Sequence, residues 1–257
     1  MIRIAIVATV TLSALILWRY IYPYTCLSLV IPLFFAIVIC AGRFFASMHR
    51  RRHWASYYLK ENSWLHHLMT GRIFSMILAI ITGSVYAFSL SAFTALGGTV
   101  EIIMLFLNGL LALFLYPITS AFVQRHAAIG VADVATKRLL TFSCFTVTAI
   151  IYIVILCKTK MPNYIDPTSL RASVDAASQQ VGSVCPFINI SLKGVQEFTA
   201  TQWFFMVAST GFLESSMLKY ASWLVFLGYS SLALMGMSLL SAELAVFSSA
   251  RSKYPQG

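Results

Sequence analysis

The chain has 257 residues, of which 59% are hydrophobic and only 10% are charged, and its formal net charge is +10. Soluble domains carry about 25% charged residues, so this composition excludes a water-soluble globular protein, which would have no way to hide so much apolar surface. The sequence predicts an all-α polytopic membrane protein, a single helical membrane domain over residues 1–257 whose basic excess is typical of cytoplasmic loops.

Two apolar stretches, residues 2–18 and 26–42, begin the chain and predict the first two membrane-spanning helices. Trp18 and Tyr20 are bulky where a secretory cleavage site needs small residues, so we expect the first helix to stay attached to the chain. The aromatic turn between the two stretches is typical of a headgroup boundary. We therefore expect a transmembrane hairpin with the N-terminus in the cytoplasm.

A basic loop, residues 43–72, follows the hairpin and holds six Lys and Arg residues against the single acid Glu61. Because Lys and Arg are retained on the cytoplasmic side, we expect this loop to be cytoplasmic. If helical, its middle part is amphipathic enough to lie in the headgroup plane or to dock a partner. The residues expected to contact a partner or anionic lipid are Arg50, Arg51, Arg52, Trp54 and Lys60.

All five histidines fall on the predicted cytoplasmic side, and His49 and His53 stand at the i, i+4 spacing that can grip a metal ion from one helix face. This spacing resembles one histidine box of the membrane di-iron oxygenases. That family needs about eight histidines in several boxes, and here one pair fits and no carboxylate lies beside it. We therefore expect no metal site and no cofactor, with His49 and His53 as the only candidate ligands.

The third and fourth spans are expected at residues 73–95 and 101–122, joined by a turn at Gly97 and Gly98. So few residues separate them that we expect antiparallel neighbours. Small residues recur at every fourth position of the third span, and on a helix they form one groove that permits close packing in lipid. This small-residue stripe consists of Ser75, Ala79, Gly83, Ala87, Ser91 and Ala95.

Two kinds of partner are open for the small-residue stripe. The favoured partner is the chain's own fourth or sixth span, and the alternative is a second subunit. Gly228 and Gly236 stand two turns apart on the sixth span and offer a matching surface.

The second half of the chain has a fifth span at residues 139–157, a polar extracytoplasmic loop at 158–197 and a sixth span at 221–247. Residues 198–213 are apolar but too short to span the membrane, so we expect an interfacial or re-entrant helix there. Six spans put both termini in the cytoplasm. Twelve of the eighteen Lys and Arg residues then lie on the cytoplasmic side, as the retention rule requires.

Polar residues inside the spans are few. Asn108 and Thr148 are the candidates for lining a pore, although hydrogen bonding between helices is the commoner role of such residues. On the outer side, Cys157 and Cys185 are the expected disulfide pair, with Cys26 as a competitor for either of them.

No nucleotide-binding or hydrolase motif occurs in the chain. The leading hypothesis is a non-enzymatic integral membrane subunit of a larger complex, in the plasma membrane or a bacterial inner membrane, which packs through small-residue faces. Its expected partners are membrane lipid and other subunits of a homo- or hetero-oligomer, while nucleic acid is not expected. The alternatives are a homo-oligomeric channel or passive transporter, and, third, a metalloenzyme on the cytoplasmic face.

Overall fold

The structure is a computed structural model that describes residues 2–58, 72–127, 131–156, 158, 161–211 and 216–253. All the regular structure within these residues is helical, which confirms the all-α class expected from the sequence. Five helical segments of the described chain are long and apolar enough to cross a membrane. They are Cys26–Met48, Arg72–Leu96, Thr99–His126, Ala132–Leu156 and Phe226–Ser248.

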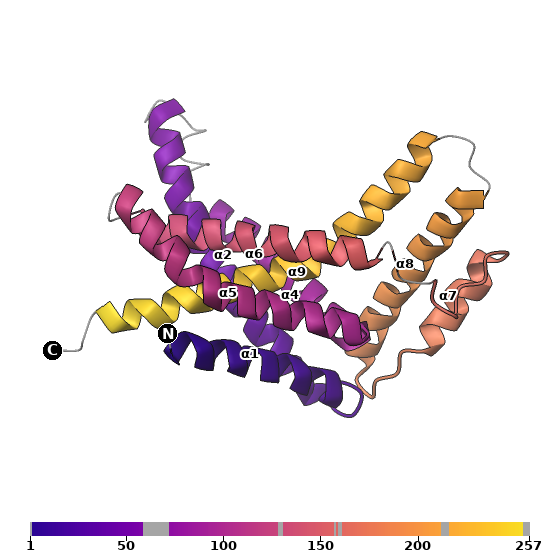
Figure 1. Ribbon diagram of the computed structural model, residues 1–257. Coiled ribbons are helices and arrows are strands. Elements are labelled where there is room, and N and C mark those ends of the chain that lie inside the picture. Colours follow the sequence, from indigo (N-terminus) through magenta and orange to yellow (C-terminus); the bar gives the residue numbers. More distant parts are fainter. Residues whose placement is uncertain are drawn as a thin grey trace.

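The N-terminal helix α1 (Ile2–Ile21) lies alongside α5 in Figure 1, and its apolar part, Ala8–Ile21, is shorter than the five spans. After the short helix η1 (Cys26–Leu29), helix α2 (Val30–Tyr58) continues well past residue 42, where we expected the basic loop to begin. Residues 43–58 contain no proline or glycine, so nothing in them ends the helix. The first half of the expected loop is therefore helical, and residues 59–71 lie outside the described chain.

Helices α4 (Arg72–Leu96) and α5 (Thr99–His126) follow each other across a glycine turn but contact each other only sparsely. Helix α4 packs mainly against α2 and α9, whereas α5 packs mainly against α6 (Ala132–Leu156) and α9. The expected pair α4 and α5 is therefore joined by the short turn, but the two helices do not pack along their lengths. A short turn makes two helices adjacent in the chain, but the small side chains along α4 decide which backbones approach it closely.

The C-terminal part consists of α7 (Leu170–Gln179), α8 (Pro186–Gly211) and α9 (Ser216–Lys253). Helix α8 begins at a proline, which favours the first helical position, and it runs unbroken past residue 198. Residues 198–211 are thus the second half of a longer helix rather than a separate interfacial one. In Figure 1, α8 and the first part of α9 form a hairpin that leans away from the direction shared by α1, α5 and α6.

Figure 1 shows that the helix ends gather at two opposite ends of the bundle. The start of α1, the end of α5, the start of α6 and the end of α9 lie together, and we call this the basic end because Arg125, Lys137 and Arg138 are there. The α1–α2 and α4–α5 connections lie at the opposite end together with the start of α8. We call this the disulfide end because a Cys26–Cys185 bridge joins η1 to the residue before α8.

The main hydrophobic core surrounds α9, which packs against α1, α2, α4, α5, α6 and α8. Its most deeply buried members include Phe35, Leu90, Met104, Leu234 and Met237. The outward faces of the spans instead expose large apolar side chains such as Phe114 and Phe142. An apolar outer face of this extent is typical of a surface that contacts lipid.

Candidate functional site

The small-residue stripe of α4 is buried along its whole length. At Gly83, the one glycine of the stripe, an added Cβ would lie 2.5 Å from Cys40 Sγ and 3.0 Å from Cys40 Cα of α2. The stripe therefore receives α2, a partner that we did not expect. Near the disulfide end, the Trp18 indole nitrogen donates a hydrogen bond to the backbone oxygen of Ser91 at 3.0 Å, so α1 also lies on this face.

The sixth span reaches α4 at only one of the two glycines that we paired with the stripe. A Cβ at Gly236 would lie 2.7 Å from the backbone oxygen of Tyr86, so the α9 and α4 backbones nearly touch there. Gly228 is exposed, and a Cβ at this position would meet nothing within 4 Å. Gly228 is therefore not part of the packing face, because α9 has already separated from α4 at that level.

A hydrogen-bonded triad joins α5, α6 and α9 in the middle of the bundle. Asn108 Nδ2 donates to Thr148 Oγ1 at 3.0 Å and to Ser238 Oγ at 2.7 Å. The two hydroxyls in turn donate to backbone oxygens of their own helices, at Cys144 and Leu234. Since all three residues are buried in a region surrounded by apolar side chains, these bonds hold three helices in one register.

Of the two roles expected for Asn108 and Thr148, this triad favours hydrogen bonding between helices over the lining of a pore. Both side chains are 0% exposed within the single chain. The amide group of Asn108 points between helices because hydrogen-bond partners there are worth more than contact with hydrocarbon. Its Oδ1 atom accepts no hydrogen bond from the described residues.

An ion pair fastens the basic end. Lys137 Nζ of α6 lies 2.6 Å from Glu243 Oε2 of α9, and the two side chains are 25% and 16% exposed. Gly42 of α2 packs directly on the Glu243 carboxylate, which leaves no room for a Cβ. The sequence analysis missed this pair. The available signal was an acid near the end of one apolar run and a base just before another, both expected at the same membrane face.

Other basic side chains lie on α2 and at the ends of α4, α5 and α6. The Arg43 guanidinium lies 5.8 Å from the centre of the Tyr86 ring, within range of a cation–π contact. Arg72, Arg125 and Arg138 are exposed at the beginnings and ends of their helices.

The disulfide end is joined covalently in a different way from the one expected. Cys185 pairs with Cys26, with their Cα atoms 4.9 Å apart, rather than with Cys157, which lies outside the described residues. Two hydrogen bonds explain the pairing: Ser183 Oγ donates to the Tyr22 backbone oxygen at 2.7 Å, and the Val184 N–H donates to that of Pro23 at 3.0 Å. These bonds align the segment before α8 with the aromatic turn that precedes Cys26.

Arg19 reinforces this end from α1. Its guanidinium donates to the backbone oxygens of Thr94 and Gly97, which are among the carbonyls left without helical partners at the end of α4.

The polar segment before α7 is held by local bonds. Thr168 donates its hydroxyl at 2.6 Å and its N–H at 2.8 Å to Asp166 Oδ1, and these bonds hold the pKa of the Asp166 carboxyl below its usual value.

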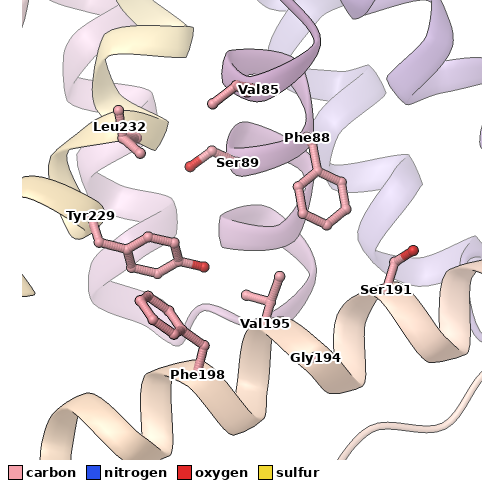
Figure 2. A pocket seen from close by; sticks show the side chains of 9 residues that line it. All are labelled: Val85, Phe88, Ser89, Ser191, Gly194, Val195, Phe198, Tyr229 and Leu232. Atoms are coloured by element: carbon pink, nitrogen blue, oxygen red, sulfur yellow. The ribbon is translucent and has the colours of Figure 1, made fainter. Parts of the chain in front are cut away.

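A groove opens where α4, α8 and α9 diverge near the disulfide end (Figure 2). It has a volume of about 320 Å³ and is lined by nine residues of these three helices. The lining is mainly apolar, with the hydroxyls of Ser89, Ser191 and Tyr229 among it. Sequence analysis gave no sign of it because the groove depends on how three distant segments diverge.

The remaining predicted site residues belong to the basic segment. The side chains of Arg50, Arg51, Arg52, Trp54, His49 and His53 lie outside the described part of the structure, although their backbone belongs to α2, and Lys60 is outside it altogether. Among the residues that the structure describes, no group of three or more His, Cys, Asp or Glu side chains is placed to hold a metal ion.

By length and composition, the helices define a multi-pass helical membrane protein. The chain matches no known family model, no curated protein and no solved structure. Its function is therefore inferred from its own residues and their geometry.

Proposed function

We propose that the chain is a non-enzymatic integral membrane subunit of a larger membrane complex, which presents its basic end to cytoplasmic partners or anionic lipid. The observation that carries this proposal is the difference in charge between the two ends. On the side that the sequence assigns to the cytoplasm, twelve basic residues stand against three acids, Glu61, Asp133 and Glu243. The other five acids belong to the opposite half, where basic residues are fewer.

The direction of the chain in the membrane follows from two independent rules. Excess Lys and Arg favour the cytoplasm for the basic end. Disulfides persist in oxidising compartments, which favours the extracytoplasmic side for the Cys26–Cys185 bridge at the opposite end. Both rules agree with six crossings, in which α1 spans and α8 does not, and with cytoplasmic termini. The plasma membrane or a bacterial inner membrane would provide the two compartments.

The interior of the bundle favours a structural role over a conducting one. The Asn108 amide joins α5, α6 and α9, and the Lys137–Glu243 pair joins α6 and α9 again at the basic end. These polar groups within the spans therefore serve to hold helices together. A homo-oligomeric channel lined by Asn108 has no support from this arrangement, and the metalloenzyme alternative depends on His49 and His53, whose side chains are not described.

The test of the subunit role is purification from the native membrane in a mild detergent, followed by analysis of size and composition. We expect a stoichiometric protein partner with the wild type. The double variant Arg125→Glu and Arg138→Glu should lose it, since both side chains are exposed at the basic end. The matched control reverses two exposed charges in the opposite half, Lys158→Glu and Arg171→Glu, and should keep the partner.

A single chain without partner from the native membrane would contradict the subunit role, and equal loss in both double variants would contradict the basic end as the docking surface. The orientation has its own test, a compartment-sensitive reporter fused to either terminus. Both reporters should be cytoplasmic. An extracytoplasmic C-terminal reporter would show that α8 crosses the membrane.

A further inference from the structure

The groove between α4, α8 and α9 has a defined position in the bundle. Gly236 marks the level at which α9 touches α4, and from there towards the disulfide end the two helices diverge. The first half of α8 crosses this gap and contributes Gly194 and Phe198 to the lining. Figure 2 shows the side chains of Ser89, Tyr229 and Leu232 around the resulting space. Its volume of about 320 Å³ is at the lower end of the range for small-molecule sites.

The groove offers hydrocarbon contacts to an occupant. The Phe198 and Tyr229 rings meet edge to face, with their centroids 5.0 Å apart, and form one wall. Figure 2 shows the Tyr229 hydroxyl pointing into the groove, where it is one of only three lining hydroxyls among the described residues. On the opposite wall, Val85 and Phe88 remain 48% and 45% exposed.

The groove is also continuous with the surface that contacts lipid. Val85 and Phe88 lie within the Arg72–Leu96 span, and Tyr229 lies within the Phe226–Ser248 span. One turn before Val85 on the same face of α4, Ile81 is 57% exposed. Because this row of exposed side chains leads directly into the groove, bilayer hydrocarbon has lateral access to it.

We propose that the groove binds one acyl chain of a membrane lipid, which enters sideways from the leaflet nearest the disulfide end. A helix about 10 Å wide would rest on the rim of this groove and leave its floor unfilled. An extended acyl chain is narrower, and it gains continuous van der Waals contact with ring and branched side chains, the interaction that drives association within lipid. This site is separate from the basic end and goes beyond the proposed subunit role.

Gly194 gives the means to test the site. It lines the groove, and a Cβ at this position would meet nothing within 4 Å, so Gly194→Leu fills the groove without a clash at the backbone. Gly228→Leu is the matched control, since Gly228 is also helical and its Cβ also meets nothing, but it does not line the groove. Val195→Phe is a second filling variant.

The experiment places the full chain in vesicles of phosphatidylcholine. Some of this lipid carries a photoreactive group on its acyl chain and serves as the probe. After irradiation, the labelled peptides are compared by mass spectrometry. We expect stronger labelling of residues 85–89 and 191–198 than of the exposed apolar face of α6 around Ile150. Gly194→Leu and Val195→Phe should remove this excess, while Gly228→Leu retains it. All variants are first checked for the elution volume of the wild type.

Three results would overturn the proposal. Equal labelling of the groove and the α6 face in the wild type would show ordinary contact with bulk lipid. An unchanged excess in both filling variants would place the labelled site elsewhere. Efficient formation of disulfide-linked dimers by Gly194→Cys would assign the groove to a second copy of the chain.

Discussion

Helix α9 has two glycines, Gly228 and Gly236, that lie in different surroundings. At Gly236 the helix lies against the Tyr86 backbone oxygen of α4, whereas two turns earlier, at Gly228, nothing stands within 4 Å of an added Cβ. Next to Gly228, the Tyr229 ring contacts Phe198 of α8, so large aromatic side chains keep the α8 and α9 backbones apart. A small residue thus permits close approach, but the side chains of the opposing helix decide whether it takes place.

The substitution Gly236→Val tests the close region most severely. The Cβ of the new side chain would lie 2.7 Å from the Tyr86 backbone oxygen. A backbone atom cannot move aside by changing a side-chain rotamer, so we expect the free energy of unfolding to fall by about 3 kcal/mol. SDS-induced unfolding in mixed micelles measures this change. Gly228→Val serves as control and should shift stability by no more than about 0.5 kcal/mol. Similar losses in the two variants would remove the distinction between the two regions.

The open region depends instead on the bridge that anchors the start of α8. Cys26→Ser should lower the free energy of unfolding by about 2 kcal/mol, the lower end of the range for disulfides, because inserted helices already restrict the unfolded chain. Thermal melting with and without reductant checks this. Reductant should lower the melting temperature of the wild type and leave that of Cys26→Ser unchanged. A wild type insensitive to reductant, even when its bridge is shown to be reduced, would contradict the anchoring role.

The hydrogen-bonded triad of Asn108, Thr148 and Ser238 belongs to the closely packed region of the bundle. Asn108→Leu removes both interhelical hydrogen bonds of the triad, and we expect a loss of about 1 kcal/mol, since such bonds average ~0.6 kcal/mol each in membranes. Unfolding in SDS again provides the measurement. The control is Thr119→Val, because the Thr119 hydroxyl bonds only to backbone oxygens of its own helix. An equal loss in the control would mean that the triad joins no helices.

Helix α8, which lines the open region, also carries a buried amide, Gln202, but its hydrogen bonding differs from that of Asn108. Both polar atoms of the Gln202 side chain are buried without a hydrogen-bond partner among the described residues. Gln202→Leu keeps a similar volume and removes this penalty, so we expect stability to rise by about 0.5–1 kcal/mol. The midpoint of thermal unfolding in detergent reports the change. A loss of stability would reveal a partner for this amide and would place a polar contact in α8.

The smallest effect is expected in the polar segment that precedes α7. Thr168→Val removes the hydroxyl that donates to Asp166 Oδ1 and keeps the backbone donor, so the pKa of the Asp166 carboxyl should rise towards its usual value. Because these bonds lower the pKa in the folded protein, their stabilising effect exists above the usual pKa of aspartate and disappears as the pH falls through the folded value. Carboxyl carbon NMR titration of both proteins measures the difference, and identical curves would contradict it.

The sequence predicted the helical class and the buried face of α4 because both follow from local patterns. Apolar runs show which segments suit a membrane, and the four-residue spacing from Ser75 to Ala95 shows which side of one helix is smooth. Neither pattern identifies the helix opposite, so the role of α2 at Cys40 was missed. The Cys26–Cys185 pairing depends on bonds to the Tyr22 and Pro23 backbone, which no spacing reveals.

Errors at helix ends have a related cause. Helix α2 continues through a strongly basic segment because charge alone does not end a helix, and α8 joins a polar beginning at Pro186 to an apolar second half. Changes in hydropathy along the sequence therefore predicted helix ends at positions where the helical backbone continues.

The central position of α9 has a consequence for how the protein is made. A ribosome delivers the chain from the N-terminus, so the helices that pack around α9 are made before α9 itself exists. Until then Asn108 lacks its Ser238 partner and Lys137 lacks Glu243. A nascent chain that stalls or is cut before α9 would hold helices that lack their common packing partner, which makes the synthesis of α9 the step on which assembly depends.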